Sequence, residues 1–147
     1  MVDIIRANLK HLPLILPLFD AYRVFYKQAS NLLEAEEFLS QRLQHNESVI
    51  FLAMQRSHAV GFTQLYPLFS SVSMAPVYLL NDLFVTDSLR GKGVGESLLN
   101  HAKDFCKASG FKGLALETAT DNPAQKLYER LGWQKDVHCF HYFWTAQ

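Results

Sequence analysis

The feature that most constrains the fold is a strand, turn and helix unit built around three alternating glycines. Residues 79–85 form an apolar run typical of a buried strand, and a polar turn then leads into glycines at 91, 93 and 95. An amphipathic pattern predicts a helix over residues 95–109, followed by Gly110 as its C′ residue. Glycines in this position leave backbone N–H groups exposed at a helix N-terminus, where the helix dipole favours an anion. The unit therefore predicts an α/β fold with a phosphate-binding turn.

The spacing of the glycines excludes two common phosphate-binding motifs. No Gly-x-x-x-x-Gly-Lys string followed by Ser or Thr occurs, so the turn is not a P-loop. The third glycine comes too early for a Gly-x-Gly-x-x-Gly dinucleotide fingerprint, and the turn lies past the middle of the chain. A glycine-rich turn without a ligand stays open as an interpretation. Arg90 and Lys92 place cations beside the turn, which favours a polyanionic ligand.

Length and composition indicate an ordinary globular protein. The 147 residues suit a single domain, residues 1–147, and 14 basic residues balance 14 acidic ones. This balance argues against nucleic acid or a membrane surface as a partner. Cys106 and Cys139 have no metal-ligand spacing and are expected to be free thiols. The N-terminus lacks the pattern of a signal peptide and no apolar run could span a bilayer, so we expect a cytoplasmic protein.

Hydrophobic periodicity predicts alternating strands and helices around this unit. A mixed sheet of about six or seven strands should be flanked by about four helices. Asn8 offers an N-cap for the first helix, and the serine-rich residues 67–75 are expected to form a loop. Strands are predicted at residues 2–6, 48–54, 59–66, 76–85 and 113–118, with two more within 133–145, and helices at residues 8–27, 32–44, 95–109 and 123–131.

Two motifs in order give the chain a family resemblance. Residues 90–95, Arg-Gly-Lys-Gly-Val-Gly, match the pattern Arg/Gln-x-x-Gly-x-Gly/Ala of the GCN5-related N-acetyltransferase (GNAT) superfamily. Residues 122–133, from Asn122 to Trp133, resemble the family's Asn-x-x-Ala/Ser-x-x-x-Tyr-x-x-x-Gly-Phe/Trp segment, although the small residue comes two positions after Asn122. One helix and one strand separate the motifs, as in that family. The chain thus resembles a small, single-domain GNAT protein, most specifically over residues 79–133.

The resemblance implies a GNAT fold and acetyl-CoA as the co-substrate. The glycine turn would hold the pyrophosphate, and backbone N–H groups of Phe84 and Val85 would polarise the thioester carbonyl beside a strand bulge. Asn122 would bond the pantetheine arm or hold splayed strands, and a plain helix N-cap is the alternative for it. The cofactor-binding residues expected from the resemblance are Phe84, Val85, Arg90, Gly91, Lys92, Gly93, Val94, Gly95, Glu96, Asn122 and Lys126.

Acyl transfer to an amine needs an acid for the leaving thiolate and a base for the amine. Tyr128 occupies the motif position of the family's tyrosine near the thioester sulfur, and its phenol is protonated at neutral pH. Asp82 and Glu117 are the candidate bases. For each of them the alternative is that the carboxylate is a solvated strand residue without a catalytic role. Asn81 stands where small polyamine acetyltransferases carry a second acidic residue, a departure that argues against a polyamine substrate. In a regular strand Asn81 and Asp82 would face opposite sides.

The acceptor is expected to be a small primary amine. Tyr22, Arg23 and Tyr26 near the end of the first helix, together with Asn81, are candidate substrate residues, with core packing as the alternative for the aromatic ones. His138 and His141 should face opposite sides of a strand, which argues against a metal site.

Several alternatives stay open at this stage. One is a lysine or N-terminal protein acetyltransferase, and another is a non-catalytic acyl-CoA-binding or regulatory domain. A nucleotide-binding module is disfavoured by the glycine spacing. The aromatic residues of the last strands would serve either a homodimer interface or the core.

Overall fold

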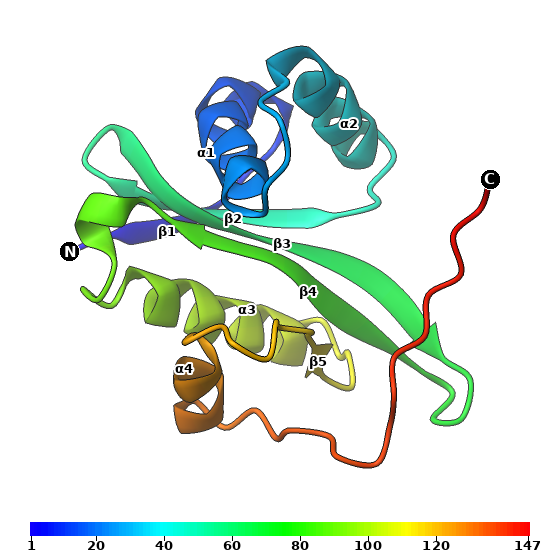
Figure 1. The fold of residues 1–147 in the computed structure, drawn as a ribbon. Helices are drawn as coiled ribbons and strands as arrows, with labels where there is room; N and C mark the ends of the chain where they lie inside the picture. The colour runs from blue at the N-terminus through cyan, green and yellow to red at the C-terminus, as the bar shows by residue number, and fades with distance from the viewer. The chain divides into compact units, whose positions relative to one another are not determined.

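The computed structural model describes residues 1–147, and these form two compact units. The first unit, residues 1–117, contains all five strands and three α-helices. The second unit, residues 118–147, contains one short helix. Figure 1 follows the chain from its blue N-terminus to its red C-terminus.

The elements alternate along the chain much as the sequence predicts. The strands are β1 Asp3–Arg6, β2 Val49–Gln55, β3 His58–Ser70, β4 Ala75–Val85 and β5 Leu114–Ala115. The helices are α1 Leu12–Phe25, α2 Leu32–Gln44, α3 Val94–Ala108 and α4 Gln125–Arg130, and short 3₁₀ turns lie at η1 Leu9–His11 and η2 Asp87–Leu89. None of these helices combines the length and the apolar character that crossing a membrane requires.

The strands form one mixed sheet in the order β1-β2-β3-β4-β5. The first four strands pair antiparallel, and β5 pairs parallel to β4. Helices α1 and α2 cover one face of the sheet and α3 covers the other (Figure 1). The predicted α/β class and the four helices are confirmed. The predicted six or seven strands are wrong, because the sheet has five.

Both faces of the sheet are buried, which explains the continuous apolar run in β2. Ile50 and Leu52 are fully buried in a cluster with residues of α1 and α2. Phe51, between them, points to the opposite face, where its ring lies 5.3 Å from that of Phe105 on α3. Alternate side chains of one strand therefore fill two separate cores.

Local signals fix some boundaries better than others. The bounds of α2 agree with the prediction, and the Asn31 side chain caps it by accepting a hydrogen bond from the Glu34 N–H at 3.1 Å. The predicted loop 67–75 is wrong for most of its length, because β3 and β4 stay paired out to Ser70 and Ala75. Serine-rich composition indicated a turn, but cross-strand pairing extends the hairpin nearly to its tip.

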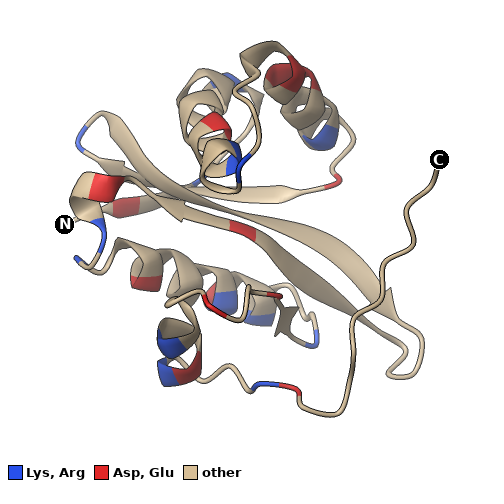
Figure 2. Cartoon of the chain, viewed as in Figure 1, with Lys and Arg blue, Asp and Glu red and all other residues tan.

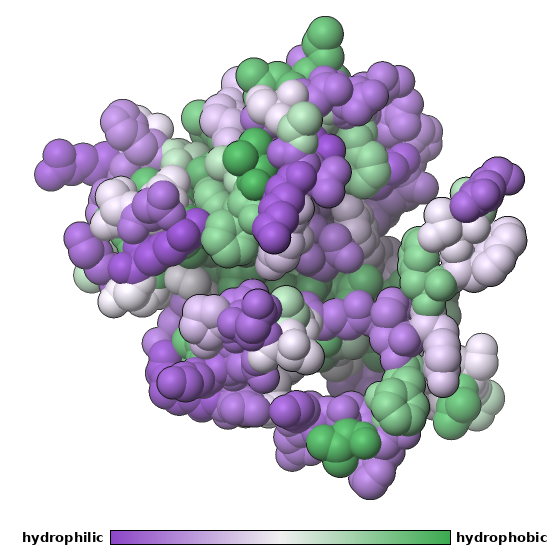
Figure 3. Space-filling view, viewed as in Figure 1, coloured by the Kyte–Doolittle hydropathy of each residue, from purple (hydrophilic) through white to green (hydrophobic).

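The strands predicted near the C-terminus are largely absent. Of the predicted strand 113–118 only β5 forms, and residues 133–147 contain no strand. The alternation of apolar residues within 133–145 favours an extended backbone. A strand also needs a neighbouring strand to pair with, and no strand pairs with this segment. Four aromatic side chains are 82–89% exposed, which excludes the core alternative for them: Phe140, Tyr142, Phe143 and Trp144. Hydrophobic and hydrophilic residues are interspersed over the face of the molecule that Figure 3 shows. The homodimer interface stays a prediction.

Candidate functional site

A bulge in β4 creates the centre of the candidate site. Gln64 of β3 pairs with Asp82, but the next residue, Leu65, pairs with Leu80, so Asn81 is an extra residue without a partner. The extra residue breaks the alternation of side chains. As a result Asn81 and Asp82 both line the same cavity, which a regular strand would not allow.

The bulge lies at Asn81 and not at Phe84 and Val85, where the resemblance led us to expect it. Phe84 and Val85 pair in regular register with Phe62 and Gly61. Beyond Leu79, however, β4 has no partner on its other side, because its pairing with β5 covers only Tyr78 and Leu79. The edge of β4 that leads to the glycine turn is therefore open to an additional strand-like partner.

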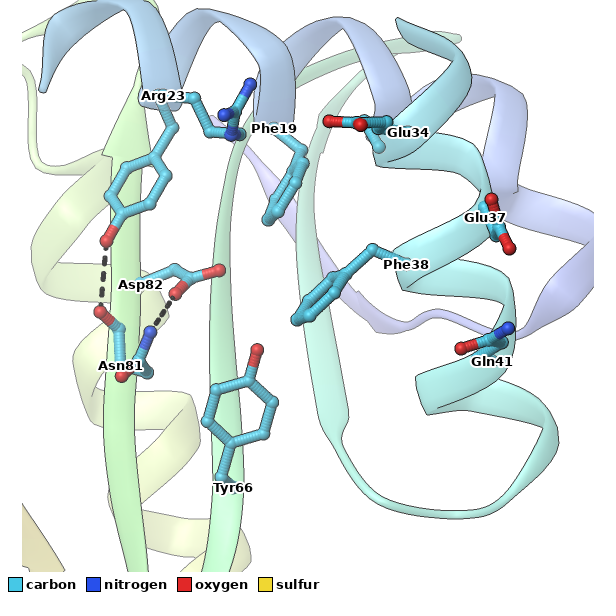
Figure 4. Close-up of a pocket in the computed structure, with 11 residues that line it drawn as sticks. Phe19, Arg23, Glu34, Glu37, Phe38, Gln41, Tyr66, Asn81 and Asp82 are labelled. Atoms are coloured by element: carbon cyan, nitrogen blue, oxygen red, sulfur yellow. Dashed lines mark hydrogen bonds between the residues drawn. The ribbon is translucent and has the colours of Figure 1, made fainter. Parts of the chain in front are cut away.

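A cavity of about 490 Å³ lies between this part of the sheet and the helices α1 and α2. Its size falls within the range of about 300–1,000 Å³ that is typical of small-molecule sites. Figure 4 shows the lining side chains converging from the two helices and the two strands. The lining residues are Phe19, Tyr22, Arg23, Glu34, Ala35, Glu37, Phe38, Gln41, Tyr66, Asn81 and Asp82.

Asp82 is the buried carboxylate of this cavity, with 2% of its surface exposed. It is also the single acidic residue of β4 (Figure 2). Burial raises the pKa of Asp82, while hydrogen bonds from Asn81 and Gln64 lower it in part. The Asn81 Nδ2 atom donates to Oδ1 at 2.7 Å and the Gln64 Nε2 atom donates to Oδ2 at 2.6 Å. These amides fix the orientation of the carboxylate and leave it able to accept further hydrogen bonds from a ligand.

Gln64 and Tyr66 belong to the same polar cluster. The Tyr66 hydroxyl and the Asp82 carboxylate point toward one another from adjacent strands (Figure 4). Burial, and next the charge of Asp82, raise the pKa of the Tyr66 phenol, so this group stays protonated at neutral pH. The Gln64 Oε1 atom is buried without a hydrogen-bond partner. Rotation of this amide group would turn Oε1 toward residue 82, where it could accept a hydrogen bond from a donor.

The end of α1 forms one wall of the cavity. The Tyr22 hydroxyl donates a hydrogen bond to the Asn81 carbonyl oxygen at 3.1 Å. Arg23 lines the cavity and donates from Nη1 to the Ala29 carbonyl oxygen at 3.0 Å. Tyr26 does not line the cavity: its ring packs edge-on against that of Tyr22, with 5.0 Å between the ring centroids. Of the predicted substrate residues, Tyr22, Arg23 and Asn81 therefore come together.

The glycine turn ends where α3 begins. Gly91 and Gly93 have φ angles of +76° and +86°, in the left-handed region that favours glycine. Gly93 is the N-cap of α3, and its carbonyl oxygen accepts the first helical hydrogen bond, from Ser97 N. No side chain caps this end, so the N–H groups of Val94 and Gly95 stay available to an anion, with the exposed Lys92 beside them.

Arg90 braces the turn from within the chain. Its Nε atom donates to the Val85 carbonyl oxygen at 3.0 Å, and Nη1 forms an ion pair with Asp87 at 2.5 Å. The guanidinium carbon lies 5.3 Å from the ring centroids of both Phe25 and Phe84. Arg90 thus joins the turn to β4 and α1, and its other N–H groups remain for a ligand.

Glu117 lies apart from the cavity. It follows β5 at the end of the first unit, is exposed, and does not line the cavity. Between the two candidate bases, the structure brings only Asp82 into the candidate site.

The second unit holds the other predicted motif. The Asn122 Oδ1 atom accepts a hydrogen bond from the Ala124 N–H at 2.9 Å, so this side chain stabilises the turn before α4. Lys126 and Tyr128 lie on α4, and the Tyr128 ring lies 6.1 Å from that of Trp133. The Trp133 N–H also donates to the Tyr128 carbonyl oxygen at 3.0 Å, which holds the end of the motif against the helix.

Comparison with known proteins decides the family. A model of the Acetyltransferase (GNAT) family matches residues 15–133. The chain belongs to this family. It is 48% identical to the uncharacterized N-acetyltransferase YhfO of Bacillus subtilis, over 96% of this chain and 95% of that protein. It is also 31% identical to a probable acetyltransferase of Haemophilus influenzae, over 87% of this chain and 97% of that protein. The chain is therefore an acyltransferase.

Solved structures agree with the GNAT assignment. The crystal structure of a probable acetyltransferase superposes with a TM-score of 0.92 at 38% identity, covering 99% of this chain and 98% of the other. By sequence, the chain is also 26% identical to an aminoglycoside N(6')-acetyltransferase type 1 of Salmonella typhimurium, over 96% of this chain and 97% of that protein. The structure of AAC(6')-Iy with a bisubstrate analogue of CoA shares the fold, with a TM-score of 0.81 at 23% identity, covering 99% of each chain.

Sequence reasoning missed several residues of the GNAT cavity. Phe19, Glu34, Phe38 and Tyr66 line the cavity but were not predicted as site residues. Gln64, which does not line it, was missed as the hydrogen-bond donor to Asp82. One signal was present, since Gln64 is a polar residue in a strand whose neighbours are apolar or β-branched. The others looked like ordinary helix-face and strand residues, and only the packing of α1 and α2 over the bulge brings them together.

Proposed function

We propose that the chain transfers the acetyl group of acetyl-CoA to the primary amine of a small molecule, by direct attack in a ternary complex. The observation that carries this proposal is the open edge of β4, which runs from the bulge at Asn81 to the uncapped N-terminus of α3. The open edge suits an extended pantetheine arm and the uncapped helix suits its diphosphate. The cavity that holds Asp82 begins at the same bulge.

The reaction needs one bond exchange and two proton movements. The amine nitrogen attacks the thioester carbonyl carbon, the new C–N bond forms and the C–S bond breaks. We assign Asp82 to accept the amine proton, directly or through water, because it is the one carboxylate on the sheet face of the cavity. We assign Tyr128 to protonate the leaving thiolate, an assignment supported by its position in the family motif.

A covalent acetyl-enzyme is not part of this mechanism. Burial raises the pKa of the Cys106 thiol, which makes it a poor nucleophile, and Cys106 does not line the cavity. Cys139 is exposed, and a hydrogen bond with Asp136 raises the pKa of its thiol. Neither cysteine therefore offers a reactive thiolate at the site.

A small acceptor suits the cavity better than a protein does. The cavity is hollowed between helices and sheet and is lined largely by aromatic and polar side chains. The aminoglycoside relative of Salmonella typhimurium, 26% identical, also supports a small amine.

The test is thiol release from acetyl-CoA against a panel of small amines, with calorimetry of acetyl-CoA binding alongside. We expect binding and turnover with at least one small amine. Binding without turnover on any amine would favour a non-catalytic acyl-CoA-binding domain, and turnover on peptides alone would favour a protein acetyltransferase. Displacement of CoA by ATP or NAD would contradict the assignment of the glycine turn.

A further inference from the structure

The charged side chains that line the cavity are mostly acidic, and they lie at two depths, at the buried sheet side and at the exposed rim. Asp82 lies at the buried sheet side, and Glu34 and Glu37 lie on α2 at the exposed rim. Arg23 is the one cation of the lining. Hydrogen bonds from Ser30 and Asn31 lower the pKa of Asp20 outside the lining, and the nearby charge of Arg23 lowers it further. Three carboxylates of the lining therefore face one guanidinium. The cavity thus keeps an excess of negative charge.

Glu34 is placed to use its charge on a ligand. In Figure 4 its carboxylate points from α2 across the cavity toward α1, whereas Glu37 lies on the side of α2 away from Asp82. Within the chain, the Glu34 carboxylate takes part in no ion pair and no side-chain hydrogen bond, and only its backbone N–H is engaged, by Asn31. The helix dipole favours an acid in this first turn of α2, but it does not require the carboxylate to face the cavity.

Aromatic rings connect the two depths. The rings of Phe19 and Phe38 stack with 6.1 Å between their centroids and an interplanar angle of 15°. Tyr66 and Tyr22 line the sheet side and the α1 side of the same space. Such walls suit the apolar stem of an alkylamine or the ring of an amino sugar, and the ring faces attract a cation. The path from Asp82 to Glu34 is therefore suited to a molecule with charge at both ends.

We propose that the acceptor carries at least two amino groups, one reacting beside Asp82 and a second, still charged, held at the rim by Glu34. This inference rests on the proposed function and adds the substrate class, which is a diamine, a longer polyamine or a polyamino sugar. Glu34 acts as a specificity residue, because its carboxylate binds the part of the acceptor that does not react.

The experiment compares linear α,ω-diamines with monoamines of the same chain length. We expect kcat/KM for the best diamine to exceed that of its matched monoamine by about three- to tenfold, the range for a charge pair at a partly exposed rim. In Glu34→Gln this ratio should fall toward the statistical value of about two that two equivalent amino groups give without a rim contact. Glu36→Gln is the matched control, because Glu36 lies on the same helix, is exposed and does not line the cavity, and it should keep the wild-type ratio.

Two results would overturn the inference while the proposed function stands. The first is equal kcat/KM for diamines and monoamines in the wild type, and the second is an unchanged diamine preference in Glu34→Gln. A binding measurement tests the rim site even if the proposed acetyl transfer fails. Calorimetry of diamine and monoamine binding to the CoA-bound protein should show the same preference, also lost in Glu34→Gln. Preferential diamine binding without any turnover would refute acetyl transfer and still support the rim site, whereas the absence of any preference would refute the rim site.

Discussion

The Tyr22 hydroxyl lies 3.1 Å from the Asn81 carbonyl oxygen, and this hydrogen bond joins α1 to the bulge of β4. The bulge is what turns Asn81 and Asp82 toward the same cavity. A side chain that we expected to touch substrate therefore also holds the backbone that shapes the site. Tyr22 connects the position of the helix wall with the direction of the Asp82 carboxylate.

Removing this hydroxyl tests the connection. Tyr22→Phe should lower the free energy of unfolding by about 1 kcal/mol, because one hydrogen bond is lost while the ring stays packed. It should also lower kcat for the best amine by a few-fold, because the bulge is held less firmly. Urea denaturation and steady-state kinetics measure the two effects. Tyr26→Phe is the control, since Tyr26 does not line the cavity, and an equal loss in that variant would contradict a specific role for Tyr22.

Asp82 provides a prediction with opposite signs for stability and activity. Because burial raises its pKa in the folded state, its contribution to stability is present below the ordinary carboxyl pKa of about 3.9 and is lost as pH rises through the higher folded-state value. Asp82→Asn should remove this pH-dependent loss, leaving the protein at neutral pH at least as stable as the wild type. A turn of the Gln64 amide would present Oε1 to the new side chain.

The same Asp82→Asn variant should lose about 10²-fold or more in kcat, because the proton acceptor is gone. In the wild type, kcat/KM should rise with pH along a limb whose pKa lies above the ordinary carboxyl value. Denaturation curves between pH 3 and pH 8 and a pH–rate profile check both parts. A variant that is unstable at neutral pH, or one that retains full kcat, would contradict this account of Asp82.

The glycine turn predicts a difference between two chemically identical substitutions. Gly93→Ala should cost about 1–2 kcal/mol of stability and weaken acetyl-CoA binding, because φ is +86° and an L residue is strained there. Gly113→Ala should have little effect, since a Cβ would meet nothing within 4 Å and the φ angle is not in the left-handed region. Thermal unfolding with and without acetyl-CoA measures both variants. Equal behaviour of the two would show that the backbone angle is not what matters at residue 93.

The assignment of Tyr128 is tested by loss of its hydroxyl. Tyr128→Phe should lower the acetylation rate by about 10²-fold or more, because the leaving thiolate loses its proton donor, while acetyl-CoA binding by calorimetry stays the same. Tyr142→Phe, at a tyrosine of the same unit that is 87% exposed, should keep the wild-type rate. An unchanged rate in Tyr128→Phe would remove its role as the acid.

The parts of the structure that the sequence predicted best depend on neighbours along the chain. Asn31 and the acidic residues after it fix the start of α2, and Gly93 and Gly110 mark the two ends of α3 closely. The glycine turn could be predicted for the same reason, because the positive φ angles of such a turn are favoured by glycine itself and depend on no distant segment. Asp82 was proposed because it is a carboxylate on a strand that the resemblance places at the border of the site.

The parts that were missed depend on pairing between distant segments. The extra residue at Asn81 changes the β3–β4 register, and no local pattern distinguishes that position from a regular strand residue. Phe38 and Tyr66 line the same cavity only because α2 packs over that part of the sheet. The C-terminal strands were predicted from alternation alone, and alternation says nothing of whether an edge is available to pair with.

The free space around Gly93 has a further consequence. A Cβ built at Gly93 would meet no atom within 4 Å, so an L residue is disfavoured there by the chirality of its backbone and not by the size of its side chain. A mirror-image residue prefers positive φ, so D-alanine introduced by semisynthesis should suit the backbone angle of the turn and restrict the unfolded chain. The nucleotide end of the co-substrate would then meet a turn that is already set before binding.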